Sequence, residues 1–142
     1  MDKSYDFLYA EDDEDTAILF GMAMSKIAPE LRYQIFDNGQ KLLNYLYGEG
    51  EHKYPASPQP KFIISDLRMP GADGYEMLQA IRVHPKTYKL PVIIYTSSYN
   101  QSDVNKCYEL GCNSYLTKPL SLDEKEKLLK ALIDYWFTFN VH

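Results

Sequence analysis

The stretch that most constrains this chain is residues 62–71, FIISDLRMPG, in which an apolar run ends in one carboxylate and then in a turn. A short, continuous apolar run bounded by turn residues is typical of a strand buried on both faces of a sheet. In open α/β sheets ligands bind beyond the carboxyl ends of the strands, so Asp66 lies where chemistry is expected. Taken alone, the stretch also fits an Asp66 that caps the following turn or helix.

The rest of the chain repeats the same alternation of strand and helix. Apolar and alternating runs predict strands over residues 6–10, 31–36, 62–65, 90–95 and 114–117. Apolar stripes at helical spacing predict helices over residues 16–27, 37–46, 75–83, 103–110 and 122–137. Because parallel strands need right-handed helical crossovers, we predict an α/β fold with a doubly wound, five-stranded parallel sheet and five helices.

Length and composition predict a single domain, residues 1–142, with no separate output domain. A net charge of −5 argues against nucleic acid or an anionic membrane as a partner. The sequence has no apolar run of membrane-spanning length, and its N-terminus lacks the features of a secretory signal, so we expect a cytoplasmic location. Cys107 and Cys112 are too few for a disulfide framework and are interpreted as free structural thiols.

Polar side chains follow four of the predicted strands. Glu11 and Asp12 follow the first strand, Asp66 the third, Thr96 the fourth and Lys118 the fifth. Because parallel strands end at the same edge of a sheet, these groups are expected to converge. Three carboxylates repel one another without a cation, and hard oxygen ligands with an incomplete shell suit Mg²⁺. Asp66, on the central strand, can then form an acyl phosphate whose oxygens Thr96 and Lys118 bind.

The acidic region has more than one interpretation. Taken alone, residues 11–15, EDDED, are typical of a solvated acidic run that favours a helix N-terminus. In the helix that follows, Ile18, Met22 and Met24 lie off the predicted core stripe and form a second apolar face. This face predicts partner docking around Ile18 and Met22, and a helix buried on two sides fits the sequence equally well.

The motifs together resemble a response-regulator receiver domain of two-component signalling, over essentially the whole chain. The resemblance rests on Glu11-Asp12, Asp66 with Met69-Pro70 and Asp73-Gly74, Thr96-Ser97, and Tyr115 before Lys118-Pro119. It implies a flavodoxin-like receiver fold with strand order 2-1-3-4-5. The long Pro-rich loop before the third strand and the ending at residues 132–137, LIDYWF, resemble more narrowly the stand-alone regulators that partner phytochrome-type histidine kinases.

The resemblance implies that Asp66 takes a phosphoryl group from a phosphohistidine on a histidine kinase or histidine phosphotransfer protein. Mg²⁺ would be held by Asp12, Asp66 and the backbone carbonyl of Arg68, with Glu11 acting mainly through a bound water. Such a chain is a phosphoacceptor that catalyses its own phosphotransfer and dephosphorylation, and no enzyme acting on an outside substrate. Its downstream target is not named by the sequence.

Further residues take roles from the same resemblance. Tyr115 would act as a switch that swings inward when Thr96 shifts, although a plain rim aromatic also fits Tyr115. Arg68 and Ser98 occupy positions that in receivers modulate hydrolysis of the acyl phosphate, and we expect Arg68 to cover the phosphoryl group partly. The bond between Lys118 and Pro119 is often cis in such proteins.

Alternatives from other classes fit less well. A phosphatase of the haloacid dehalogenase kind needs a second Asp two residues after the nucleophile, where this chain has Arg68. A flavodoxin-like cofactor module needs neutral amide donors after the first strand, where Glu11, Asp12 and Asp13 would repel a phosphate. A receiver-like interaction scaffold without phosphorylation stays as the alternative function. The aromatic end of the chain, with Tyr135, Phe137 and Phe139, predicts either a homodimer surface or rings folded back onto the domain.

Overall fold

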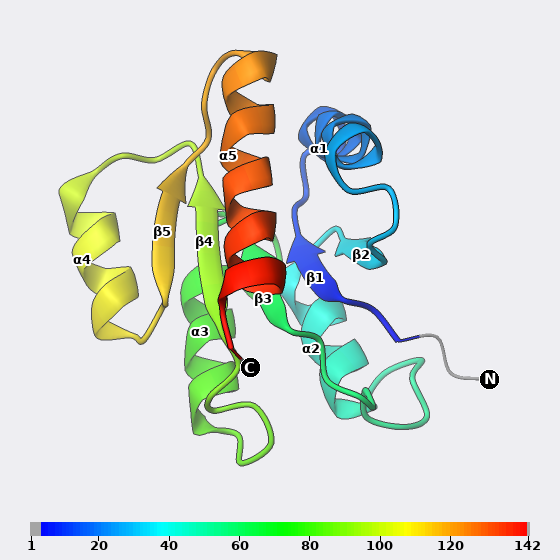
Figure 1. The fold of residues 1–142 in the computed structure, drawn as a ribbon. Helices are drawn as coiled ribbons and strands as arrows, with labels where there is room; N and C mark the ends of the chain where they lie inside the picture. The colour runs from blue at the N-terminus through cyan, green and yellow to red at the C-terminus, as the bar shows by residue number, and fades with distance from the viewer. Residues whose placement is uncertain (1–3, 142) are drawn as a thin grey trace.

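Five parallel strands form one sheet, and helices cover both of its faces in the computed structural model (Figure 1). The structure describes residues 4–141, so residues 1–3, part of the stretch considered as a secretory signal, and residue 142 lie outside it. The strand order β2-β1-β3-β4-β5 confirms the predicted doubly wound sheet. The elements are β1 (Phe7–Ala10), α1 (Glu14–Ile27), β2 (Tyr33–Phe36), α2 (Gly39–Tyr47), β3 (Phe62–Ser65), α3 (Gly74–Val83), β4 (Val92–Thr96), α4 (Gln101–Glu109), β5 (Ser114–Thr117), α5 (Leu122–Asp134) and a π-helix η1 (Tyr135–Phe139).

The central strands are apolar along their length because both faces of the sheet are covered. β1, β3 and β4 are fully buried, whereas the edge strands β2 and β5 are partly exposed. Register places Ile64 of β3 beside Tyr9 of β1 and Ile93 of β4. Successive side chains alternate between two cores: Leu8 packs in the core with α2, α3 and α4, and Phe7 in the core with α1 and α5.

The acidic run at residues 11–15 has two parts: one lies at the end of β1, and the other caps and begins α1. Asp13 caps α1, accepting a hydrogen bond from the Thr16 amide at 2.8 Å, and Glu14 and Asp15 lie in the first turn. Negative side chains in this position stabilise the partial positive charge of a helix N-terminus. The helix therefore begins two residues before the predicted Thr16, and only the first two acidic residues are left for the strand end.

Two predictions about the helices are wrong in detail. Met24, placed on an outer face of α1, is only 1% exposed and packs in the core that contains Phe20 and Leu129. The last α-helix ends at Asp134, and the wider π-helical turn η1 follows. Within residues 4–141, no helix combines the length and the apolar character needed to cross a bilayer.

The aromatic end of the chain was interpreted either as a homodimer surface or as rings folded back onto the domain, and some of its rings are partly buried while others are exposed. The rings of Trp136 and Phe137 fold back and lie 5.8 and 5.5 Å, centroid to centroid, from the ring of Phe62. Tyr135 and Phe139 are exposed. The exposed pair leaves the homodimer surface as a prediction.

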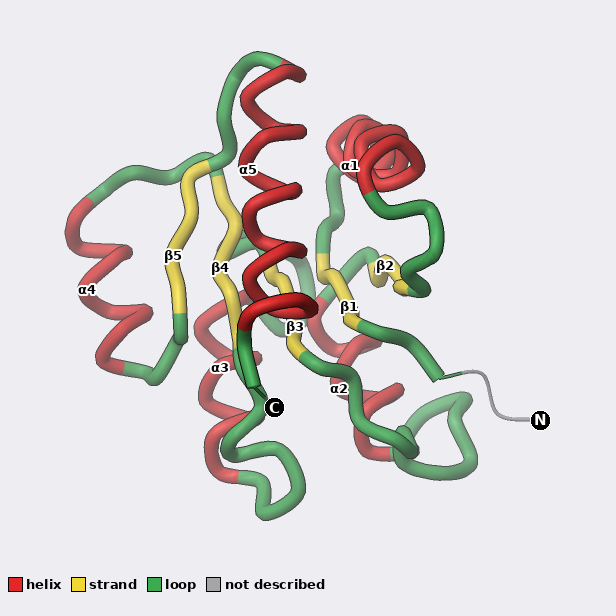
Figure 2. The backbone as a smooth tube through the Cα atoms, in the orientation of Figure 1, coloured by secondary structure: helices red, strands yellow, loops and turns green. Residues whose placement is uncertain are grey.

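The loops that follow β1, β4 and β5 lie at one edge of the sheet, and the loop over residues 48–61 lies at the opposite edge (Figure 2). The first residue of α2 contacts the loop that follows β3, where the amide of Gly39 donates to the carbonyl of Ala72 at 3.1 Å. A Cβ atom at residue 39 would overlap the Ala72 oxygen and the Met77 side chain. Only glycine allows this close approach of two backbones.

Candidate functional site

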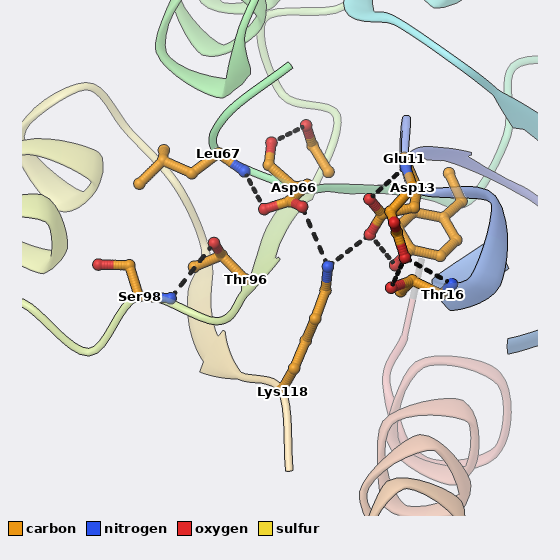
Figure 3. Close-up of polar contacts among 10 residues, drawn as sticks. Glu11, Asp13, Thr16, Asp66, Leu67, Thr96, Ser98 and Lys118 are labelled. Atoms are coloured by element: carbon orange, nitrogen blue, oxygen red, sulfur yellow. Dashed lines mark hydrogen bonds and ion pairs between the residues drawn. The ribbon is translucent and has the colours of Figure 1, made fainter. Parts of the chain in front are cut away.

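Glu11, Asp66, Thr96 and Lys118, four of the polar residues that were predicted to converge, meet at the carboxyl ends of the strands (Figure 3). Glu11 directly follows β1, Asp66 follows β3 and Lys118 follows β5, while Thr96 is the last residue of β4. Each residue ends a strand of the parallel sheet or directly follows one, so the sheet fixes where these residues lie.

Lys118 joins the two carboxylates at the centre of this group. Its Nζ lies 2.5 Å from Oε1 of Glu11 and 3.0 Å from Oδ2 of Asp66. The side chains are shielded from solvent, with 9% of Lys118, none of Glu11 and 14% of Asp66 exposed. Attraction between charges is strong where water is excluded, so Lys118 holds the first, third and fifth strand ends together.

The protonation states follow from burial and from these contacts. Burial raises the pKa of Glu11, and the Asp66 charge adds to the rise, while the contact with Lys118 opposes it. Burial by itself would lower the pKa of Lys118, but hydrogen bonds and charge from Glu11 and Asp66 outweigh it and raise the Lys118 pKa. Lys118 therefore stays a cation between the two carboxyl groups.

Glu11 is held by two further donors. The hydroxyl of Tyr9, two residues earlier on β1, donates to Oε1 of Glu11 at 3.0 Å, and the Asp13 amide donates to Oε2 at 3.2 Å. Tyr9 is completely buried, and burial raises its pKa, so its hydroxyl stays a donor. Tyr9 was missed by sequence reasoning, although its spacing of two from Glu11 along a strand places both on the same face.

A divalent metal ion fits the acidic side of the site. One carboxylate oxygen from each of Glu11, Asp12 and Asp66 can be chosen so that all three lie within 4.8 Å of one another. Glu11 is buried, Asp66 is half-buried and Asp12 is exposed, so the group opens to solvent on one side. Hard oxygen donors with an incomplete protein shell leave places for water and for substrate oxygens. The ligand role of the Arg68 carbonyl stays a prediction.

Asp66 is not the cap of the following helix. Asp73 caps α3, in a capping box with Glu76. The Oδ1 atom of Asp66 accepts from the Leu67 amide at 2.6 Å, while its Oδ2 atom faces Lys118. The carboxylate is thus fixed by a backbone donor on one side and by a cation on the other.

The β4 end is connected to β5 by backbone and side-chain contacts. The Thr96 side chain accepts a long hydrogen bond of 3.5 Å from the Ser98 amide, and the Thr96 carbonyl accepts from the Lys118 amide at 2.7 Å. The hydroxyl of Tyr115 donates to the Ser98 carbonyl at 2.9 Å. The predicted switch residue Tyr115 therefore contacts the loop that follows Thr96.

The peptide bond between Lys118 and Pro119 is trans, and not cis as it often is in receivers. Among residues 4–141, the only cis peptide bond is the one between Ser57 and Pro58.

The two predicted modulators meet at a residue that the sequence did not single out. Arg68 Nη2 lies 3.0 and 3.1 Å from the two carboxylate oxygens of Asp103, and the Ser98 hydroxyl donates to Asp103 Oδ2 at 2.7 Å. Within residues 4–141 no hydrogen bond or ion pair joins Arg68 to Asp66. The sequence gives no signal for Asp103, because a single Asp in a polar helix is usually solvated.

The predicted docking residues lie apart from this centre but on the helix that leaves it. Ile18 and Met22 of α1 are 55% and 57% exposed. Their apolar side chains form an open face on a helix whose N-terminus follows Glu11 and Asp12. A docking role for this face stays a prediction.

Comparison with known proteins assigns the family. The model of the response regulator receiver domain matches residues 7–132. The chain is 36% identical over 102 residues to the response regulator Rcp1 of Synechocystis sp., covering 72% of this chain and 68% of Rcp1. It superposes on the phosphorylated cyanobacterial phytochrome response regulator RcpA with a TM-score of 0.87 at 25% identity, covering 98% of both chains.

A metal-bound relative is also similar. The manganese-bound form of Rcp1 has a TM-score of 0.80 at 28% identity, and the match covers 95% of this chain and 96% of that one. The match of the family model extends from β1 into α5 and includes every residue of the site described above. The chain belongs to the response regulator receiver domain family.

Proposed function

We propose that Asp66 accepts a phosphoryl group from a phosphohistidine of a histidine kinase or histidine phosphotransfer protein, in a reaction that requires Mg²⁺. The observation that carries the proposal is the convergence of Glu11, Asp12 and Asp66, whose carboxylate oxygens lie within 4.8 Å of one another, with Lys118 bound to Asp66. In the transfer, a bond forms between an Asp66 oxygen and phosphorus, the bond from phosphorus to the imidazole nitrogen breaks, and the imidazole keeps the electron pair.

The residues of the chain orient the nucleophile and neutralise charge. The Leu67 amide and Lys118 hold the two Asp66 oxygens, so the carboxylate needs little reorientation before attack. Once the phosphoryl group is present, the Lys118 ammonium and the Thr96 hydroxyl bind its oxygens. Mg²⁺ would be held by Asp12, Asp66 and the Arg68 carbonyl, with Glu11 acting through water, and would supply positive charge for the carboxylates and phosphoryl oxygens.

The output is proposed to be a change in a binding surface near Tyr115. In the structure the Tyr115 hydroxyl is bound to the Ser98 carbonyl, in the loop that leaves Thr96. A movement of Thr96 toward the phosphoryl group would pull this loop and alter the position of the Tyr115 ring, which is a two-state change biased by local charge. The chain acts in this scheme as a phosphoacceptor and not as an enzyme on an outside substrate.

The name of RcpA as a phytochrome response regulator supports a narrower proposal about the phosphoryl donor. We infer that the kinase belongs to the phytochrome type and that the transfer takes place in the cytoplasm. The apolar face with Ile18 and Met22 is its proposed docking surface. Transfer from a panel of purified histidine kinases, compared at equal concentrations, tests this: a preference for a kinase of another sensor class contradicts it.

Phosphorylation by acetyl phosphate with Mg²⁺, measured by intact mass, tests the central proposal. Wild type should gain one phosphoryl group, and Asp66→Asn should gain none. Asp37→Asn is a matched control, because Asp37 also follows a strand end of the same sheet but is exposed and pairs with Lys41. Omission of Mg²⁺ should abolish the gain. Absence of any Asp66-dependent gain in wild type contradicts the proposal and favours the scaffold that works without phosphorylation.

A further inference from the structure

Asp103 is a buried carboxylate that gathers donors from three separate parts of the chain. It lies in the first turn of α4 and is 8% exposed. It accepts from Arg68 in the loop after β3, from the Tyr75 hydroxyl of α3 at 2.5 Å, and from the Ser98 hydroxyl in the loop after β4. A buried carboxylate with this many donors fixes the position of the helix turn that carries it.

Asp103 remains charged in this setting. The hydrogen bond from Tyr75 lowers the pKa of Asp103 most, and the hydrogen bond from Ser98 and the charge of Arg68 lower it further. Burial opposes them but is outweighed. The Tyr75 ring is itself covered by Lys106 of α4, whose Nζ lies 4.1 Å from the ring centroid. α3 and α4 are therefore connected at the same point by a hydrogen bond and by a cation–π contact.

The two partners of the ion pair differ in their freedom to move. The Arg68 side chain is 68% exposed and uses one nitrogen, Nη2, for both Asp103 oxygens, whereas the Asp103 side chain is 11% exposed and has two other donors. Arg68 follows Asp66 by two residues on the same loop. The guanidinium can therefore leave Asp103 for a new anion at Asp66 while Asp103 keeps Tyr75 and Ser98.

We propose that Asp103 is a positioning residue that holds Arg68 away from Asp66 in the unphosphorylated protein and gives it up when an anion occupies the phosphoryl position. A phosphoryl group carries more negative charge than one carboxylate and offers three acceptor oxygens to the planar guanidinium. The exchange removes one of the three connections that fix the first turn of α4. It thereby couples the state of Asp66 to α4 by a route separate from Thr96 and Tyr115. This inference rests on the proposed function.

Binding of beryllofluoride with Mg²⁺, measured by isothermal titration calorimetry, tests the exchange in four proteins: wild type, Arg68→Ala, Asp103→Asn and the double variant. In wild type the Asp103 carboxylate competes with the ligand for Arg68. Asp103→Asn removes this competition and should tighten binding about fivefold, the effect of a partly exposed ion pair of about 1 kcal/mol. In the Arg68→Ala background the same substitution should change the affinity by less than about twofold, because no guanidinium is left to release. Arg68→Lys should restore the dependence on Asp103.

Hydrogen exchange of the first turn of α4 gives a second measurement that does not require Asp103 to be changed. Beryllofluoride should lower protection there in wild type, and Arg68→Ala should show low protection with or without the ligand. An equal effect of Asp103→Asn in both backgrounds, or protection in Arg68→Ala as high as in unliganded wild type, overturns the exchange and leaves Asp103 a structural residue. Failure of wild type to bind beryllofluoride, with Asp66→Asn behaving in the same way, overturns the proposed function and this inference with it.

Discussion

Removal of the Lys118 charge should destabilise the protein in a manner that depends on pH. Lys118→Met keeps most of the length of the side chain and deletes the cation that touches both Glu11 and Asp66. The two buried carboxyl groups then face each other without compensation. Protonation of Glu11 is the least costly way to remove this repulsion, because burial and the Asp66 charge already raise the Glu11 pKa. The opposing effect of Lys118 is absent in the variant.

The cost of that proton sets the size of the effect. Glu11 has an ordinary pKa of 4.5 in the unfolded chain, so holding it neutral at pH 7 costs about 3.4 kcal/mol, at about 1.36 kcal/mol per pH unit. Loss of one partner of a buried ion pair typically costs about 3–5 kcal/mol, which agrees. The folded-state pKa of Glu11 in the variant lies above the unfolded value. The variant therefore loses little stability below pH 4.5 and progressively more as the pH rises toward the folded-state pKa.

Urea denaturation of wild type and Lys118→Met, without divalent metal, provides the assay. We expect a loss of about 3 kcal/mol at pH 7 that shrinks to about 1 kcal/mol at pH 5. At a typical urea dependence, the loss at pH 7 lowers the unfolding midpoint by about 1–2 M. Lys130→Met is the control, because the exposed pair of Lys130 with Asp134 is worth at most about 0.5 kcal/mol. A loss at pH 7 below about 1 kcal/mol, or one that does not change with pH, refutes the reasoning.

Three other predictions concern separate parts of the molecule. Gly39→Ala should lower the free energy of unfolding by about 2 kcal/mol or more because its Cβ overlaps a backbone oxygen. Gly21→Ala, within α1, should raise it by about 0.5–1 kcal/mol, because the new Cβ makes only an ordinary contact of 3.6 Å with the Tyr33 hydroxyl; thermal unfolding compares the two variants. Met22→Glu should slow phosphotransfer from the kinase at least about tenfold and leave phosphorylation by acetyl phosphate unchanged. Burial raises the pKa of Cys107 to about 12 and of Cys112 to about 11, so both thiols should resist alkylation by iodoacetamide at pH 8 until the protein is unfolded; rapid labelling of the native protein contradicts this.

The sequence predicts the fold well because the pattern is strong at every level. Fully buried strands read as unbroken apolar runs, and the caps Asp13, Asn38 and Asp73 stand at helix starts. Two errors lie where tertiary packing outweighs local pattern. Met24 is buried because α5 packs against α1, and the π-helical turn after Asp134 forms where Trp136 contacts Phe62, neither of which periodicity reveals.

The candidate site was predictable to the extent that its residues follow strands. The topology brings Glu11, Asp66 and Lys118 together, and the order of polar strand ends along the chain was enough to find them. Contacts made by helices were not predictable in the same way. Asp103 meets Arg68 across 35 residues of sequence, and the spacing of neither residue points to the other.

The ion pair between Lys118 and Glu11 spans 107 positions of the sequence, and β3 and β4 separate their strands in the sheet. A chain still being synthesised presents its acidic residues long before the cation that neutralises them has left the ribosome. Until then the two carboxylates stay hydrated, because burying them beside each other without a cation is costly. Lys118 can therefore neutralise Glu11 and Asp66 only after β5, the last strand of the chain to be synthesised, has joined the sheet.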